Sequence, residues 1–322
     1  MKKRLFCVFL AFLLLTFPLC GCGGEREDAR VKIVCTVFPF YDWARNVVGS
    51  VDGVEILWLA DNGSDLHSFQ PSASDIIEIA SADLVVYTGG VSDGWIADAL
   101  KNGKGDGGLA LSVADGIVLR PVSAESGHSE EDGHSHEVDE HLWLSLNNAL
   151  AAVEEIAERL CRLDPDYAET YRSNAEAYAE QLRSLDRSFA ESLAGETSLR
   201  LLFADRFPFV YLTEDYGIEY RAAFSGCTTD VDADFSTVIG LAEIADQWGL
   251  RYIMVTESAD TSLAESVIRT TESKDQTVLR LESMQAVRRE QAERGMTYLS
   301  AMEENFATIL QALEIKTGGQ GE

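Results

Sequence analysis

Two histidines stand beside carboxylates in a chain that has five histidines among 322 residues. His67 follows Asp65 by two positions. His141 follows Asp139 by two positions and Glu140 directly. Neutral imidazole is the commonest protein ligand for zinc and its neighbours, and a nearby carboxylate can orient the ring. Either histidine alone is more often a surface or core residue, but together they predict a divalent-metal site.

The other histidines lie in one polar stretch, residues 122–141, which is punctuated by glycine and rich in carboxylates; they are His128, His134 and His136. This composition cannot bury a core, so we expect a mobile loop. Imidazole nitrogen suits zinc, whereas oxygen-rich sites suit manganese. The loop therefore favours zinc and is a candidate auxiliary metal-binding segment. The alternative is a solvated acidic linker with incidental histidines.

His67 and His141 must be positioned by secondary-structure elements, and the first half of the chain predicts a set of them. Short β-branched runs alternate with amphipathic stretches, which is typical of βα units on a parallel sheet. His67 would follow the second strand, at the carboxyl end of the sheet, where open α/β sheets usually bind ligands. His141 would begin a later helix. The predicted strands are 31–37, 54–59 and 83–87, and the predicted helices are 39–48 and 74–80.

The same alternation restarts in the second half of the chain. It predicts strands over 199–204, 252–256 and 277–281, and helices over 207–216, 234–248, 261–271 and 285–313. The fold class is therefore α/β, with two lobes that are each a parallel-sheet βα domain. The N-terminal lobe spans 31–164 and contains the histidine loop, and the C-terminal lobe spans 195–317.

A single long helix, 165–194, is predicted to join the lobes. Pro165 suits its first turn, and apolar residues recur at spacings of three and four from Tyr167 to Leu193. At 1.5 Å per residue the stretch from Asp166 to Leu193 is about 42 Å long, enough to run the height of both lobes. Such a stiff connection predicts small closing motions in place of wide hinge opening.

Several motifs resemble the metal-binding lipoproteins of ABC importers for zinc and manganese, over nearly all of the chain beyond residue 30. The family tends to have proline where Leu66 stands here. The resemblance implies one metal ion between the lobes, with two ligands from each, and His67 and His141 match the N-terminal two. The motifs are Asp65-Leu66-His67-Ser68-Phe69-Gln70-Pro71, Glu140-His141-Leu142-Trp143, Leu163-Asp164-Pro165 with Tyr171, Asn174 and Tyr178, and Phe209-Val210-Tyr211 with Tyr216-Gly217-Ile218.

The resemblance also implies two ligands from the C-terminal lobe. The family's acidic ligand just after the last core strand corresponds to Glu282. Its remaining ligand, a histidine or glutamate ten positions before the Tyr-Gly pair, falls on Arg206, which stays protonated and offers no lone pair. The neighbouring Asp205 is the expected substitute; the alternative is an ordinary ion pair between Asp205 and Arg206.

Another arrangement of the C-terminal lobe stays open. Arg206 would pair with Glu282 or Glu257 and help to lock the lobes, and water or the thiolate of Cys227 would complete a three-ligand site. A buried, inert thiol is the alternative reading of Cys227. In relatives, loops like 122–141 are held to feed the main site or to sense saturation, and adhesion to host surfaces is a function often attached to the family.

The N-terminus is typical of a bacterial lipoprotein. Residues 1–21 read as a signal peptide, because a basic start precedes an apolar run that is too short to span a bilayer comfortably. Leu19-Cys20-Gly21-Cys22 fits lipoprotein processing, so Cys22 is the expected lipidated residue, followed by a tether over 22–30. Two acyl chains give stable attachment. We expect an extracytoplasmic protein that is lipid-anchored to the cell membrane.

The formal net charge of −28 makes nucleic acid a poor partner and attracts cations without choosing among them. Three cysteines, Cys35, Cys161 and Cys227, remain beyond the expected lipidation site. An odd number argues against a disulfide framework.

The predicted function is capture of one divalent metal, Zn²⁺ first and Mn²⁺ as the alternative, by a monomer that delivers it to an ABC permease. Binding needs neutral imidazoles, so affinity should fall below a pH of about 6.5, the unperturbed histidine pKa. One rival is a receptor for a metal chelate or a corrinoid, whose anionic group Arg206 would suit. A zinc hydrolase is disfavoured, because the chain has no His-Glu-x-x-His motif. We therefore expect no enzyme.

Overall fold

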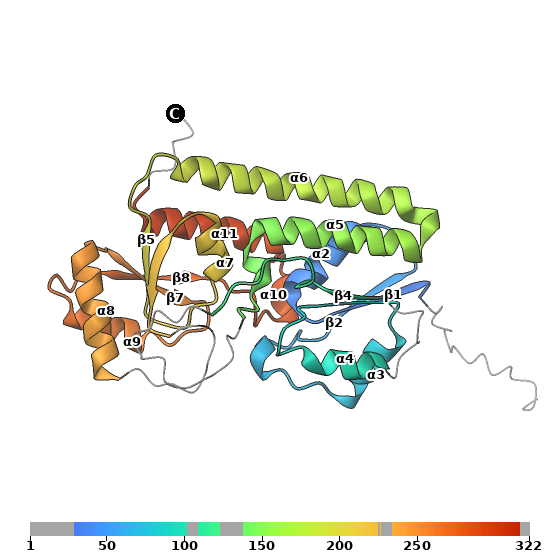
Figure 1. Ribbon diagram of the computed structural model, residues 1–322, viewed down its shortest axis with the longest axis horizontal. Coiled ribbons are helices and arrows are strands. Elements are labelled where there is room, and N and C mark those ends of the chain that lie inside the picture. Colours follow the sequence, from blue (N-terminus) through green and yellow to red (C-terminus); the bar gives the residue numbers. More distant parts are fainter. Residues whose placement is uncertain (1–28, 102–108, 123–137, 225, 227–233, 316–322) are drawn as a thin grey trace, which may run out of the picture.

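The computed structural model describes residues 29–101, 109–122, 138–224, 226 and 234–315. Two parallel sheets form the centres of two lobes (Figure 1). The first has the strand order β2-β1-β3-β4, and the second has the order β6-β5-β7-β8. The predicted two-lobe α/β class is confirmed. The strands are β1 (Val31–Cys35), β2 (Val54–Trp58), β3 (Leu84–Tyr87), β4 (Leu109–Ser112), β5 (Arg200–Phe203), β6 (Glu219–Ala222), β7 (Tyr252–Thr256) and β8 (Thr277–Leu281).

Helices cover both faces of the N-terminal sheet. In Figure 1, α3 (Ala73–Ser81) and α4 (Gly94–Lys101) lie below it, and α2 (Phe38–Val48) and α5 (Leu146–Leu163) lie above it. Ser72 begins α3 with a capping box, in which its hydroxyl accepts the Asp75 N–H at 3.2 Å and the Asp75 carboxylate accepts the Ser72 N–H at 2.7 Å. Such a cap satisfies donors that a helix start otherwise leaves without partners.

The C-terminal lobe contains α7 (Val210–Asp215), α8 (Phe235–Trp248), α9 (Ser262–Thr270), α10 (Arg289–Glu293) and α11 (Tyr298–Ala312). The prediction of one terminal helix over 285–313 is wrong. Gly295 has φ 103°, which a right-handed helix excludes, and it separates α10 from α11. Thr297 then caps the new helix by accepting the Ser300 N–H at 3.1 Å.

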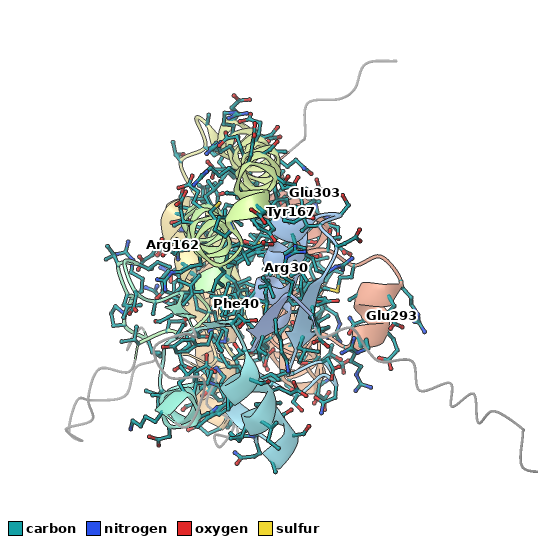
Figure 2. The ribbon with its side chains drawn as sticks, turned by 90° about the vertical axis from the view of Figure 1, so that its right-hand side faces the viewer. Arg30, Phe40, Arg162, Tyr167, Glu293 and Glu303 are labelled. Carbon is teal, nitrogen blue, oxygen red and sulfur yellow. The ribbon has the colours of Figure 1, made fainter. Side chains whose placement is uncertain are left out.

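The predicted linking helix is present as a short turn, η4 (Pro165–Tyr167), followed by α6 (Ala168–Leu193). At 1.5 Å per residue its 26 residues span about 39 Å, and α6 runs along both lobes (Figure 1). At its start the Tyr167 ring lies 4.4 Å from the Arg30 guanidinium, and the two residues adjoin in Figure 2. The buried face comprises Tyr171, Ala175, Tyr178, Ala179, Leu182, Phe189 and Leu193.

Buried hydrogen bonds join the lobes near their centre. The Trp143 indole Nε1 donates to the Ser283 carbonyl at 2.8 Å, and the Tyr298 hydroxyl donates to the Trp143 carbonyl at 2.6 Å. The Tyr298 N–H in turn donates to the Asp42 carboxylate at 3.0 Å. Because Trp143 and Tyr298 are fully buried, these bonds form in a low-dielectric interior, where an unmatched polar group costs most.

A second set of contacts joins the lobes at their surface. The Arg289 guanidinium forms an ion pair with the Asp61 carboxylate, to which its Nε donates at 2.8 Å. An antiparallel bridge between Asn62 and Arg288 lies beside it. The segment after β2 in one lobe is therefore fixed to the start of α10 in the other.

Within the described residues, no helix is long and apolar enough to cross a membrane. Cys35 and Cys161 are free and buried, and burial raises the pKa of both thiols. Neither forms a disulfide.

Candidate metal centre

His67 lies in a short turn, η1 (Leu66–Ser68), just beyond β2. The Asp65 carboxylate caps this turn by accepting the His67 backbone N–H at 2.9 Å. The ring contacts other residues: its Nδ1 lies 2.9 Å from the Ser92 hydroxyl and 3.5 Å from the Glu140 carboxylate. The neighbouring carboxylate expected to orient the ring thus holds the backbone, and residues from distant segments orient the imidazole.

His141 is almost fully buried, with 1% of its surface exposed, and directly precedes the turn η3 (Leu142–Leu144). Its Nδ1 lies 2.9 Å from the Asp139 carboxylate, so here the expected carboxylate does orient the ring. An ionised carboxylate can only accept a hydrogen bond, so the ring proton belongs on Nδ1 and the lone pair on Nε2. Ligating histidines usually have this arrangement.

The two Nε2 atoms lie 3.4 Å apart, and the ring planes are inclined by 59°. Two nitrogens bound to one tetrahedral zinc ion at the usual 2.0–2.1 Å are about 3.3 Å apart. The separation of this pair therefore fits a shared metal ion, and the donor chemistry fits zinc.

Glu282 and Glu257 follow β8 and β7, at the carboxyl ends of the second sheet. Burial first, and the charge of Glu257 second, raise the pKa of Glu282 to about 7. One Glu282 oxygen accepts the Met284 N–H at 2.9 Å, while the Glu257 carboxylate accepts the N–H and the hydroxyl of Ser283, both at 2.9 Å. A cation beside these carboxylates would favour the ionised form of Glu282.

Asp205 and Arg206 follow β5, as expected, but their contacts differ from those predicted. The Asp205 carboxylate accepts the Thr256 N–H at 3.0 Å and also the Thr256 hydroxyl, so it fixes the end of β7. The ion pair that the structure gives Arg206 is with Asp65, at 3.7 Å, and not with Asp205, Glu257 or Glu282. Arg206 therefore reaches across the lobes to the turn that carries His67.

The structure thus brings His67 and His141 together. In the described part of the chain, no group of three or more His, Cys, Asp or Glu side chains has the arrangement of a metal site. The participation of Glu282 and Asp205 stays a prediction. The other candidates lie outside the described residues; they are Cys22, His128, His134, His136 and Cys227.

Sequence reasoning missed one residue at the pair. Gln285 is 3% exposed, and its Oε1 lies 3.0 Å from Nε2 of His141. Glutamine carries no charge and belongs to no metal motif, so its type gives no signal. Its place three positions after Glu282, in the same strand-end segment, is the signal that could have found it.

Two parallel-sheet lobes on one long helix, with a pair of imidazoles where they meet, define a class: a two-lobed α/β protein with a metal-type site between its lobes. The particular family follows from comparison with known proteins. The chain belongs to the family described as zinc-uptake complex component A, periplasmic, which matches residues 33–312. The resemblance noted in the sequence is therefore confirmed.

Named relatives agree with this membership. The zinc-binding lipoprotein AdcA of Streptococcus pneumoniae (strain ATCC BAA-255 / R6) is 31% identical over 311 residues, which are 95% of this chain and 60% of AdcA. The chain thus spans about three fifths of that relative. The high-affinity zinc uptake system protein ZnuA of Bacillus subtilis (strain 168) is 24% identical over 321 residues, covering 97% of this chain and 98% of ZnuA.

A solved structure confirms the two-lobe fold. The Zn(II)-bound ZnuA-like domain of Streptococcus pneumoniae AdcA superposes with a TM-score of 0.71 at 27% identity. The match covers 88% of this chain and 98% of that domain.

Proposed function

We propose that this protein captures one divalent transition-metal ion, zinc in preference to manganese, between its lobes and delivers it to the permease of an ABC importer. The observation that carries the proposal is the 3.4 Å separation of the His67 and His141 Nε2 atoms. Family membership and the zinc named for AdcA and ZnuA support it. Imidazole ligands favour zinc over manganese.

The proposed ligands are His67 and His141 from the N-terminal lobe and Glu282 from the C-terminal lobe, with Asp205 as a further candidate. Glu282 would place a negative charge beside the cation. Asp205 would have to give up its hydrogen bonds with Thr256. His128, His134 and His136 would form an auxiliary site.

The setting is proposed with the function. The expected protein is a monomer outside the cytoplasm, anchored to the membrane by lipid on Cys22, with a permease as its partner. A receptor for an organic anion is less well supported, because the positive charge of Arg206 already faces the Asp65 carboxylate.

Calorimetric titration of zinc and of manganese tests the function directly. The protein without residues 1–24 should bind one zinc ion tightly at the lobe interface and manganese more weakly, and removal of residues 122–137 should leave that site intact. If removal of the loop abolishes zinc binding, the interlobe site is not a metal site, and a receptor for an organic chelate becomes the better account.

Proton release should report on Glu282. Its pKa of about 7 lies above the ordinary 4.5, so the folded metal-free protein binds more protons than the unfolded chain between those values. This contribution to stability is fully present below pH 4.5 and is lost as the pH rises through 7. Zinc favours the ionised carboxylate, so binding at pH 6 should release more protons than binding at pH 8.

Calorimetry at pH 6 in buffers of different ionisation enthalpy measures this release, with Glu282→Gln as the control. The histidine contribution is common to both proteins, so the difference isolates Glu282. Equal release from the two proteins would show that Glu282 does not lose a proton to the metal.

The variant Asp205→Ala tests whether Asp205 is a metal ligand or a structural residue that holds Thr256. The hydrogen bonds with Thr256 predict a loss of stability of about 1–3 kcal/mol, because the N–H and hydroxyl of Thr256 lose their acceptor. Zinc affinity should change by no more than a few-fold if those bonds persist in the metal-bound state. Urea unfolding and zinc titration of the same variant distinguish the roles; a large loss of affinity at unchanged stability would make Asp205 a ligand.

A further inference from the structure

Gln285 occupies the side of His141 that a captured metal must use. The Oε1 atom of Gln285 lies 3.0 Å from Nε2 of His141, and the same nitrogen lies 3.4 Å from Nε2 of His67. Both His141 and Gln285 are buried, at 1% and 3% exposure. Distances of 3.0–3.4 Å are those between neighbouring ligand atoms around one zinc ion, which are about 3.3 Å apart in tetrahedral geometry.

The backbone before Gln285 turns its side chain toward the N-terminal lobe. Met284 has φ 59°, a left-handed conformation that is uncommon for a residue other than glycine. The Glu282 carboxylate holds this turn by accepting the Met284 N–H at 2.9 Å. The Trp143 indole fixes the same segment through the Ser283 carbonyl. The position of Gln285 is thus defined by bonds within its segment and by one bond across the lobes.

Three lone-pair donors converge at this point. The Asp139 carboxylate accepts a hydrogen bond from Nδ1 of His141, and in this tautomer Nε2 of His141 presents a lone pair. The Gln285 amide oxygen offers lone pairs of its own, 3.0 Å from that nitrogen. A cation between Nε2 of His67, Nε2 of His141 and Oε1 of Gln285 would be within reach of all three atoms.

We propose that Gln285 is a ligand of the captured ion through its side-chain amide oxygen. This inference rests on the proposed function and deepens it. Arg206 stands where the resemblance implies a third ligand, and Gln285 would supply a donor from the same lobe without adding negative charge. The amide oxygen is a neutral, hard donor, so its presence shifts the site toward manganese relative to a third imidazole.

The test is zinc affinity by competition with a chromophoric chelator, together with the visible absorption of the Co²⁺-loaded protein. Gln285→Ala should weaken zinc by at least the roughly 10–100-fold that loss of an indirect partner of a ligand costs. The Co²⁺ spectrum should change in position or intensity, because one ligand atom is replaced. Gln285→Glu, which keeps an oxygen at the same place, should retain Co²⁺ and bind zinc at least as tightly at pH 8.

Matched controls make each outcome decisive. Gln311→Ala, at an exposed glutamine of α11, should leave both affinity and spectrum unchanged. If Gln285→Ala weakens zinc but leaves the Co²⁺ spectrum as it was, Gln285 only positions His141 and the proposal is overturned. It is overturned equally if the affinity does not change, or if Gln285→Glu fails to hold Co²⁺. Retention of tight zinc by His67→Ala would instead overturn the proposed function itself.

Discussion

Replacing His67 or His141 with alanine is expected to lower the affinity for zinc on the order of 10³-fold, because the binding free energy of a four-ligand zinc site is shared among its ligands. His141 should be the more sensitive position. Its ring is 1% exposed and is oriented by Asp139, so water cannot easily take its place. His67 is partly exposed and is oriented by Ser92 and Glu140.

Chelator competition at pH 7.5 measures the effect, and the thermal unfolding midpoint of each metal-free variant shows whether it has folded. His128→Ala is the matched control, since it removes one imidazole from the proposed auxiliary loop and should leave the tight site as it is. Asp139→Asn should give an intermediate loss of about 10–100-fold, as expected when the partner of a ligating histidine is changed. Wild-type affinity in His141→Ala would contradict the interlobe site.

Replacing Trp143 with alanine is expected to cost about 3–5 kcal/mol of stability, the usual cost of emptying a large aromatic position in a core. The side chain is fully buried, its ring contacts Phe40 edge-on, and its Nε1 donates to the Ser283 carbonyl of the other lobe. Its ring also packs edge-on against His141, with centroids 5.3 Å apart. The loss of stability should therefore be accompanied by weaker zinc binding.

Guanidinium unfolding of the metal-free protein measures the stability, and zinc titration under native conditions measures the second effect. Trp143→Phe should lose less, about 1–3 kcal/mol, because packing survives while the Ser283 carbonyl loses its donor. Trp248→Ala, at a partly exposed tryptophan at the end of α8, serves as the control and should cost less than Trp143→Ala. An unfolding transition of Trp143→Ala at the wild-type midpoint would show that this residue does not join the lobes.

Strands β7 and β8 of the C-terminal sheet could be predicted from the sequence, and β6 could not, although β6 and β8 both lie at edges of the sheet. The bounds of β7 and β8 match the predicted 252–256 and 277–281, because both runs are rich in β-branched and apolar residues. β6 reads Glu-Tyr-Arg-Ala and has no apolar run. It is a strand because β5 pairs with it in parallel, which is a tertiary effect that local composition does not encode.

Some residues of the candidate site could likewise be predicted from the sequence, and others could not. His67 and His141 could be predicted because histidine is scarce here and because the strand order places the His67 turn at the ligand-binding end of the sheet. The pairing of Arg206 with Asp65 could not be predicted, because Asp205 is the carboxylate that adjoins Arg206 in the sequence and only the fold brings Asp65 to it. The position of the Gln285 side chain depends on the left-handed turn at Met284. A methionine in the sequence gives no indication of such a conformation.

The contacts between the lobes have a consequence for the timescale of metal exchange. Asp61 with Arg289, Asp65 with Arg206, and Trp143 with Ser283 hold the two lobes against each other, while α6 spans both. An ion bound behind these contacts leaves only when several of them break together, so its residence time is set by a mechanical barrier as well as by its ligands. A partner that competes for Asp61 or Arg289 would lower that barrier and shorten the residence time, and could thereby time the release of cargo without altering a single ligand.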